Sequence, residues 1–203
     1  MGIPDHNIYT QVLVSARKEF LEKGYTKASL REICKKAGVT TGALYKRFPN
    51  KESLFMALVE PVIRDVYLLE KRVEEHDYAC LEKGNAREIW EASTETIKDY
   101  ANFIYDRYEG FRLLLCKAEG SPCNNFMHDF VTRHTKVTLK FLKVVQEKGM
   151  NVKLINEMEL HMLLTAFYAT LFEPLLHGLS REDALRHCEY VAQLFNWRVI
   201  FGF

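Results

Sequence analysis

Residues 29–51, SLREICKKAGVTTGALYKRFPNK, decide the fold of the first part of this chain. Ser29 and Glu32, three residues apart, have the spacing of a capping box, which predicts the start of a helix. Gly38 can adopt the left-handed conformation that ends this helix and turns the chain. Thr40 then predicts the N-cap of a second short helix. Two short helices joined by a tight turn are typical of a helix-turn-helix that docks on DNA.

The rest of the chain also has helical spacing. Apolar residues recur at steps of three and four, and no window alternates with the period of a strand. The sequence therefore predicts an all-α fold of about nine helices. Pro61 lies inside the fourth helix, so we expect a kink or break near Glu60. The expected helices cover about 6–23, 30–37, 41–47, 51 onward, 86–108, 111–118, 122–148, 156–178 and 181–200.

Charge is unevenly distributed along the chain. Residues 1–51 contain ten Lys or Arg and four Asp or Glu, a net charge of +6. The remaining residues contain 18 basic and 23 acidic side chains, a net charge of −5. A basic N-terminal segment followed by an acidic remainder indicates that the N-terminal segment binds a polyanion. A chance fluctuation of surface charge is the alternative.

Composition excludes several other classes of protein. The five cysteines are scattered and never spaced as CxxC, which predicts reduced thiols rather than disulfides or a zinc site. The sequence has no secretory signal and no apolar run long enough for a membrane span, so we expect a soluble, cytoplasmic protein. His161, Glu173, His177 and His187 lack the spacing of a metal motif, and we expect neither a metal nor a cofactor.

The stretch from Val39 to Phe55, VTTGALYKRFPNKESLF, closely resembles the TetR/AcrR family of transcriptional repressors. The family pattern V-[ST]-x-G-x-[LIF]-Y-x-x-F, followed by [NSD]-K-[ED]-x-L, is matched in register. An upstream block also fits, through Ala16, Phe20, Gly24, Tyr25, Ala28, Ser29, Leu30 and Ile33. The resemblance covers residues 10–56. It implies a helix-turn-helix domain over 1–50 and a C-terminal regulatory and dimerisation domain over 51–203, connected by the helix that begins at 51.

The resemblance also implies which residues contact DNA. The small residues of the 41–47 helix suit close approach to a major groove, whereas Leu44 and Phe48 anchor that helix to the core. A packed aromatic residue is the alternative for Tyr45. Because position 41 is a threonine, Lys46 or Arg47 would have to contact guanine, or Thr41 a thymine methyl group. The expected DNA contacts are Ser29, Arg31, Thr40, Thr41, Gly42, Tyr45, Lys46 and Lys51.

The C-terminal part is rich in aromatic residues, for which a packed core is the default interpretation. By analogy with the family, some of them are expected to line a cavity for a small hydrophobic or planar effector in a mostly uncharged site. These are Ile63, Tyr67, Tyr100, Phe103, Phe111, Phe126, Phe130, His134, Phe141, Leu164 and Tyr168.

The last two helices have small and apolar residues along one face each, the pattern of a homodimer interface. The candidates are Met162, Thr165, Ala169, Phe172, Leu176, Cys188, Val191 and Phe195. Burial within a single chain is the alternative for each face.

The leading functional hypothesis is therefore a homodimeric repressor that binds a pseudo-palindromic operator and is released by a ligand. A second hypothesis is a DNA-binding scaffold controlled by a protein partner. A third, a helical-bundle enzyme or carrier, would need polar groups that converge in a cavity. No catalytic motif supports an enzyme.

Overall fold

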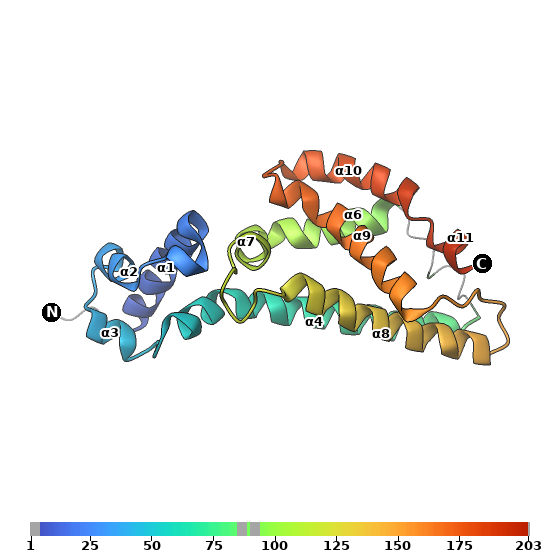
Figure 1. Ribbon diagram of the computed structural model, residues 1–203, viewed down its shortest axis with the longest axis horizontal. Coiled ribbons are helices and arrows are strands. Elements are labelled where there is room, and N and C mark those ends of the chain that lie inside the picture. The colour runs from blue at the N-terminus through green and yellow to red at the C-terminus, as the bar shows by residue number, and fades with distance from the viewer. Residues whose placement is uncertain (1–4, 85–88, 90–93, 203) are drawn as a thin grey trace. The chain divides into compact units, whose positions relative to one another are not determined.

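The computed structural model describes residues 5–84, 89 and 94–202. All regular elements in these ranges are helices, which confirms the all-α fold (Figure 1). The helices are α1 (Asp5–Lys27), α2 (Leu30–Ala37), α3 (Thr41–Tyr45), α4 (Lys51–Glu82), α6 (Thr94–Asp106), α7 (Tyr108–Cys116), α8 (Phe126–Glu147), α9 (Glu157–Leu176), α10 (Arg181–Leu194) and α11 (Trp197–Phe201). The expected helix start at 86 lies outside the described residues.

The chain forms two compact units, and their boundary differs from the expected division at residue 50. The first unit contains the described residues up to Val66 together with Arg107–Phe126. The second contains those of Tyr67–Asp106 and Met127–Phe203. The helix α4 therefore contributes its first half to one unit and its second half to the other, and α7 belongs to the unit that contains α1–α3.

The caps of the helix-turn-helix follow the sequence closely. The Ser29 hydroxyl accepts the N–H of Glu32 at 3.4 Å, and the Thr40 hydroxyl accepts the N–H of Ala43 at 3.1 Å. Gly38 has φ 65° and ψ 30°, the left-handed conformation that ends α2. The helix α4 begins after Asn50, whose side-chain oxygen accepts the N–H of Ser53 at 2.7 Å.

The expected capping box is only half formed, because a more distant residue supplies its second bond. The Ser29 N–H donates to Oε1 of Glu19 in α1 at 3.3 Å, rather than to Glu32. The fully buried Glu19 carboxylate also accepts from Lys23 Nζ at 2.7 Å and Lys36 Nζ at 2.8 Å. Burial alone would raise the pKa of Glu19, but the bonds from Lys23, Lys36 and Ser29 outweigh it and lower the pKa to about 2. Glu19 thus holds α1 and α2 together.

The core of the first unit contains the apolar residues expected from their helical phase. Phe20, Ile33, Leu44 and Leu54 are fully buried, and the rings of Phe20 and Phe55 meet edge to face with centroids 5.1 Å apart. Each buried side chain of this size contributes about 1.5–3 kcal/mol when it leaves water. The core therefore fixes α2 and α3 against α1 and the start of α4.

Of the kink or break expected near Glu60, the break is wrong. The helix α4 continues through Pro61 as one element of 32 residues. Proline removes one backbone donor and costs about 3 kcal/mol inside a helix. Leu58, Val59 and Val62 are buried on either side of it, so packing holds both flanking turns in place.

The helix α7 is tied to α1 and α4 within the first unit. Glu109 of α7 pairs with Arg17 of α1 at 3.0 Å, and the Lys117 carbonyl accepts the N–H of Tyr25 at 2.8 Å. A Cβ added at Gly110 would lie 2.3 Å from the Val62 side chain, so only glycine allows this approach of α7 to α4.

In the second unit α10 packs on α6 and α9 (Figure 1), and α8 pairs with the second half of α4 through Arg133 and Glu70. The expected last helix, 181–200, is wrong because it is two helices. Phe195 leaves the helical conformation with ψ 76°, and Asn196 caps α11 by accepting the N–H of Val199 at 3.2 Å. The helix expected from 122 begins only at Phe126, after a turn.

None of the helices in the described ranges is long and apolar enough to cross a bilayer.

Candidate nucleic-acid interface and ligand pocket

The short helix α3 has one buried side and one exposed side. Leu44 and Phe48 are buried and attach it to the core, and Phe48 also stacks on Tyr9 with centroids 5.6 Å apart. The exposed side contains Thr40, Thr41, Gly42, Tyr45 and Lys46. Half of the Tyr45 side chain is exposed, so the alternative of a packed aromatic residue does not apply to the isolated chain.

Gly42 leaves open space on this exposed side. A Cβ added there would meet only the Thr40 hydroxyl, at 4.0 Å, and the backbone does not require a glycine. The chain's own packing therefore gives no reason for a glycine at this position. A glycine is explained if another molecule approaches α3 closely here, because a methyl group would stand between the two surfaces.

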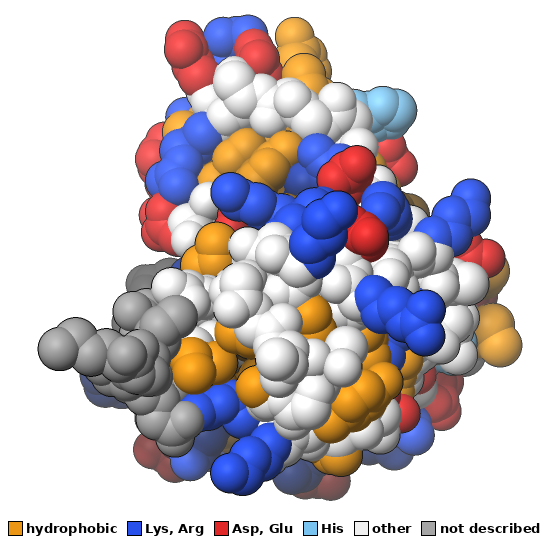
Figure 2. Space-filling view, turned by 90° about the vertical axis from the view of Figure 1, so that its left-hand side faces the viewer, with side chains coloured by type: hydrophobic (Ala, Val, Ile, Leu, Met, Phe, Trp, Pro, Cys, Tyr) orange, Lys and Arg blue, Asp and Glu red, His pale blue; other side chains and the backbone are white. Residues whose placement is uncertain are grey.

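Basic side chains surround α3. Arg31 of α2 and Lys46 at the C-cap of α3 are both exposed, whereas Ser29 is half-buried at its capping position. Figure 2 shows Lys and Arg side chains spread over the face of the molecule on which the N-terminal helices lie.

Lys51 is bound by its own chain. Its Nζ donates to the Thr26 carbonyl at 2.9 Å and lies 5.0 Å from the centre of the Tyr25 ring. Burial lowers its pKa from the usual value. Lys51 therefore links the start of α4 to the end of α1, and this contact positions the motif.

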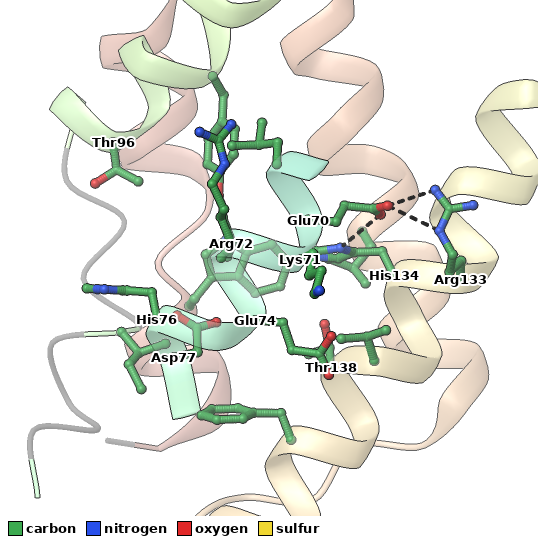
Figure 3. A pocket seen from close by; sticks show the side chains of 18 of the residues that line it. Glu70, Lys71, Arg72, Glu74, His76, Asp77, Thr96, Arg133, His134 and Thr138 are labelled. Carbon is green, nitrogen blue, oxygen red and sulfur yellow. Dashed lines mark hydrogen bonds and ion pairs between the residues drawn. The ribbon is translucent and has the colours of Figure 1, made fainter. Parts of the chain in front are cut away.

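The second unit contains a pocket of about 700 Å³ between the second half of α4 and helices α6, α8 and α9 (Figure 3). Of the residues expected at a ligand site, six line it: Tyr67, Tyr100, His134, Phe141, Leu164 and Tyr168. The other five, Ile63, Phe103, Phe111, Phe126 and Phe130, are not part of its lining. Phe111 and Phe130 are buried in the packing of the chain.

The pocket also contains charged residues that the expectation of a mostly uncharged site left out. Glu70, Lys71, Arg72, Glu74 and Asp77 of α4 and Arg133 of α8 line it. The sequence contains a pattern that indicates an inward position for the three acids. The buried face of α4 includes Val66 and Leu81, and the acids lie between them at the same spacing of three and four residues.

One of the three acids is neutralised inside the protein. The Glu70 carboxylate accepts from Arg133 at 2.9 and 3.2 Å, and His134 Nδ1 lies 4.0 Å from it (Figure 3). Burial, with a smaller contribution from the charge of Arg133, lowers the pKa of His134 to about 4, so this imidazole is neutral at pH 7. Burial and the charges of Asp77 and Asp99 raise the pKa of Tyr100 to about 12.

The expected dimer residues differ in how far they are exposed. Met162, Thr165 and Leu176 are exposed, and Ala169 and Phe195 are half-buried. Phe172, Cys188 and Val191 are buried inside the chain itself, so they pack its core and offer almost no surface to a partner. The outer faces of α9 and α10 expose other large apolar residues, among them Met158, Tyr190 and Leu194.

The fold and the capped α2–α3 pair define a helical protein with an N-terminal helix-turn-helix. Residues 12–58 match the family described as bacterial regulatory proteins, tetR family. Over these residues the chain belongs to the TetR family.

Two curated relatives illustrate how the sequence likeness is distributed. The chain is 40% identical over 50 residues to the HTH-type transcriptional regulator UidR of Escherichia coli K12, which is 25% of this chain and 26% of UidR. It is 30% identical over 122 residues to the transcriptional activator FasR of Mycolicibacterium smegmatis, which is 60% of this chain and 47% of FasR. The chain thus spans about a quarter to a half of the length of these relatives.

A solved structure covers almost the whole chain. NalD of Pseudomonas aeruginosa, the secondary repressor of the MexAB-OprM multidrug efflux pump, matches with a TM-score of 0.54 and 19% identity. The match covers 93% of this chain and 95% of NalD. At this identity the likeness supports the fold of both units.

Proposed function

We propose that the protein is a transcriptional regulator that binds double-stranded DNA through α3 and the start of α2. The observation that carries this proposal is the exposed side of α3, where small residues and Lys46 lie opposite the buried Leu44 and Phe48. The net charge of +6 over residues 1–51 supports it, because basic groups near α3 attract phosphates. DNA is a cytoplasmic target in bacteria, so we place the protein there.

Within this proposal the exposed residues have separate roles. Tyr45, Lys46 and Arg31 contact phosphates, Thr41 meets a base edge, and Gly42 allows the helix to approach the groove. Lys51 acts mainly as a positioning residue, since the Thr26 carbonyl already binds its ammonium group. Ser29 contributes as the N-cap of α2.

We propose a homodimer built on the outer faces of α9 and α10. Support comes from Met158, Met162, Tyr190 and Leu194, each more than half exposed on these two helices. A dimer places two recognition helices on the half-sites of a pseudo-palindrome. Light scattering of Tyr190→Glu should show a monomer, whereas the exposed Glu182→Gln should leave the mass unchanged.

We propose that a small molecule in the second unit controls DNA binding. A pocket of about 700 Å³ is in the size range of small-molecule sites, whereas a fully packed core would have favoured the scaffold controlled by a protein partner. The chain passes between the units within α4, between α6 and α7, and at the start of α8. A ligand that binds one conformation better shifts the population toward it. A form that leaves DNA when the ligand binds would act as a repressor.

The experiment selects bound duplexes from a random pool and titrates the enriched sequence with the wild type and Tyr45→Ala. We expect a palindromic site and a loss of about tenfold or more in affinity for the variant. Tyr9→Ala, which removes an aromatic ring from the stack on Phe48, controls for lost packing. No enriched sequence, or equal affinities of wild type and Tyr45→Ala, would overturn the proposal.

A further inference from the structure

The acids of the pocket occupy positions where a helix packed on apolar surroundings has apolar residues. On α4, Val66 is 6% exposed and Leu81 is 4% exposed. Glu70, Glu74 and Asp77 continue the same face between them, and all three are at least partly buried (Figure 3). A carboxylate at such a position is costly unless a positive charge balances it.

Among the described residues, Glu70 is the one of these three acids that forms an ion pair. Arg133 pairs with Glu70 at 2.9 Å, and its guanidinium also lies 4.3 Å from the centre of the Tyr67 ring. Across residues 5–84, 89 and 94–202, no basic side chain forms an ion pair with Glu74 or Asp77.

Lys71 and Arg72 of α4 also line the pocket, but their contacts are with other groups. Lys71 pairs with Glu75 at 3.7 Å and its side chain is 72% exposed. Arg72 is exposed, and its Nε donates to the Leu68 carbonyl at 3.3 Å. The lining therefore has as many Lys and Arg as acids, but among the described residues Glu74 and Asp77 are in no ion pair with any of them.

The pKa of Asp77 is that of a buried carboxylate with no ion pair among the described residues. Burial raises its pKa to about 6, and nearby Glu74 adds to the effect while His76 opposes it. A positive charge placed in the pocket would remove this cost.

Aromatic residues of the other helices line the same pocket as the acids. Tyr100, Phe141, Tyr168 and Trp197 line the same pocket. Tyr168 is nine-tenths buried, and its ring meets the rings of Phe130 and His134 with centroids 4.7 and 5.4 Å away. Aromatic faces attract organic cations. No group of three metal-binding side chains was found in the described residues, so the arrangement fits an organic cation better than a metal ion.

We propose that the pocket binds an organic cation with an aromatic or aliphatic body, its positive charge beside Glu74 and Asp77 and its body against the aromatic walls. This inference rests on the proposed ligand-responsive function and names the class of its effector. Arg133 remains paired with Glu70 in the complex and marks the end of the pocket where the ligand has no charge.

The test compares two probes of nearly equal size and opposite permanent charge, tetraphenylphosphonium and tetraphenylborate. Calorimetric titrations use the full chain without DNA, in sodium buffer at pH 7.5. Asp77→Asn removes the charge at the pocket, and Glu75→Gln is the matched control, because Glu75 lies on the same helix with its side chain 66% exposed. Thermal melts confirm that both variants fold.

We expect the wild type to bind the phosphonium at least about tenfold more tightly than the borate. Asp77→Asn should lose about fivefold or more of the phosphonium affinity, and Glu75→Gln should stay within about twofold of the wild type. Tighter borate binding, no binding of either probe, or an unchanged Asp77→Asn variant would each overturn the proposal. DNA binding is measured separately, so the cation assignment can fail while DNA recognition stands.

Discussion

The two halves of α4 use the same helical face in opposite ways. In the first half, Leu58, Val59 and Val62 bury apolar side chains in the unit that contains the helix-turn-helix. In the second half, Glu70, Glu74 and Asp77 point the same face into a pocket. A continuous helix can therefore be a packed support in one unit and a wall of a binding site in the other. The comparison teaches that helical phase predicts which residues face inward, and residue chemistry then predicts whether they face a core or a cavity.

The largest expected effect comes from placing an acid among the buried apolar residues of the first half of α4. An apolar residue in place of an acid in the second half is the comparison. Val59→Asp buries a charge where no space is open, and it should lower the free energy of unfolding by about 3 kcal/mol or more. Asp77→Leu should change it by less than about 1 kcal/mol or raise it, because no described residue forms an ion pair with that carboxylate. Urea unfolding measures both values. Equal losses for the two variants would break the distinction between the halves.

A second prediction concerns Glu19, the buried carboxylate that is fully paired. Glu19→Gln should lower the free energy of unfolding by about 2 kcal/mol, since it weakens three hydrogen bonds to a charged group. The pKa of Glu19 is lowered in the folded protein, so its stabilisation is present at neutral pH and is lost as the pH falls toward about 2. The exposed Glu22→Gln is the control. Parallel stability curves of wild type and Glu19→Gln between pH 2 and pH 7 would contradict this role.

Asp77 should show the opposite pH dependence, with an effect of about 1–2 kcal/mol. Its pKa is raised to about 6, so the folded protein loses stability as the pH rises from its usual range to about 6. The other titratable groups of the pocket lining are Tyr67, Glu70, Lys71, Arg72, Glu74 and His76 on α4, Tyr100 on α6, Arg133 and His134 on α8, and Tyr168 on α9. Asp77→Asn should therefore be more stable than the wild type at pH 7, and the difference should shrink toward pH 4. A constant difference across this range would show that Asp77 titrates normally.

The smallest expected effect on stability concerns Gly42. Because a methyl group there has open space, Gly42→Ala should raise the free energy of unfolding by at most about 1 kcal/mol. The same methyl group should weaken DNA binding about tenfold by holding α3 away from the groove. Gly110→Ala is the contrasting glycine: its Cβ would lie 2.3 Å from Val62, so it should destabilise the protein by about 1–3 kcal/mol. Thermal melts and DNA titrations separate the two cases.

The helix-turn-helix could be predicted from sequence because its signals are local. Ser29, Gly38, Thr40 and Asn50 each act within three or four residues, and each does so in the structure. The bond from Ser29 to Glu19 joins residues ten positions apart, and no local rule indicates it. The helix caps could therefore be predicted from the sequence, but the carboxylate that joins α1 to α2 could not.

The pocket was predictable only in part, for a related reason. Tyr67, Tyr100, His134, Phe141, Leu164 and Tyr168 line it, but aromatic side chains in a helical bundle fill cores as readily as they line cavities. The acids on the inner face of α4 were the more specific signal, since an unpaired carboxylate rarely faces a closed core. The last helix breaks at Asn196, whose side chain caps α11. A single asparagine is common in helices and loops, so it did not predict this break.

The salt dependence of DNA binding tests the central claim, that the exposed side of α3 contacts DNA. Affinity for the selected duplex is measured at several salt concentrations for the wild type, for Lys46→Ala and for Lys71→Ala, an exposed lysine of the second unit. If Lys46 contacts a phosphate, the slope of log affinity against log salt concentration should fall by about one for Lys46→Ala and stay unchanged for Lys71→Ala. Identical slopes for all three proteins would contradict the claim.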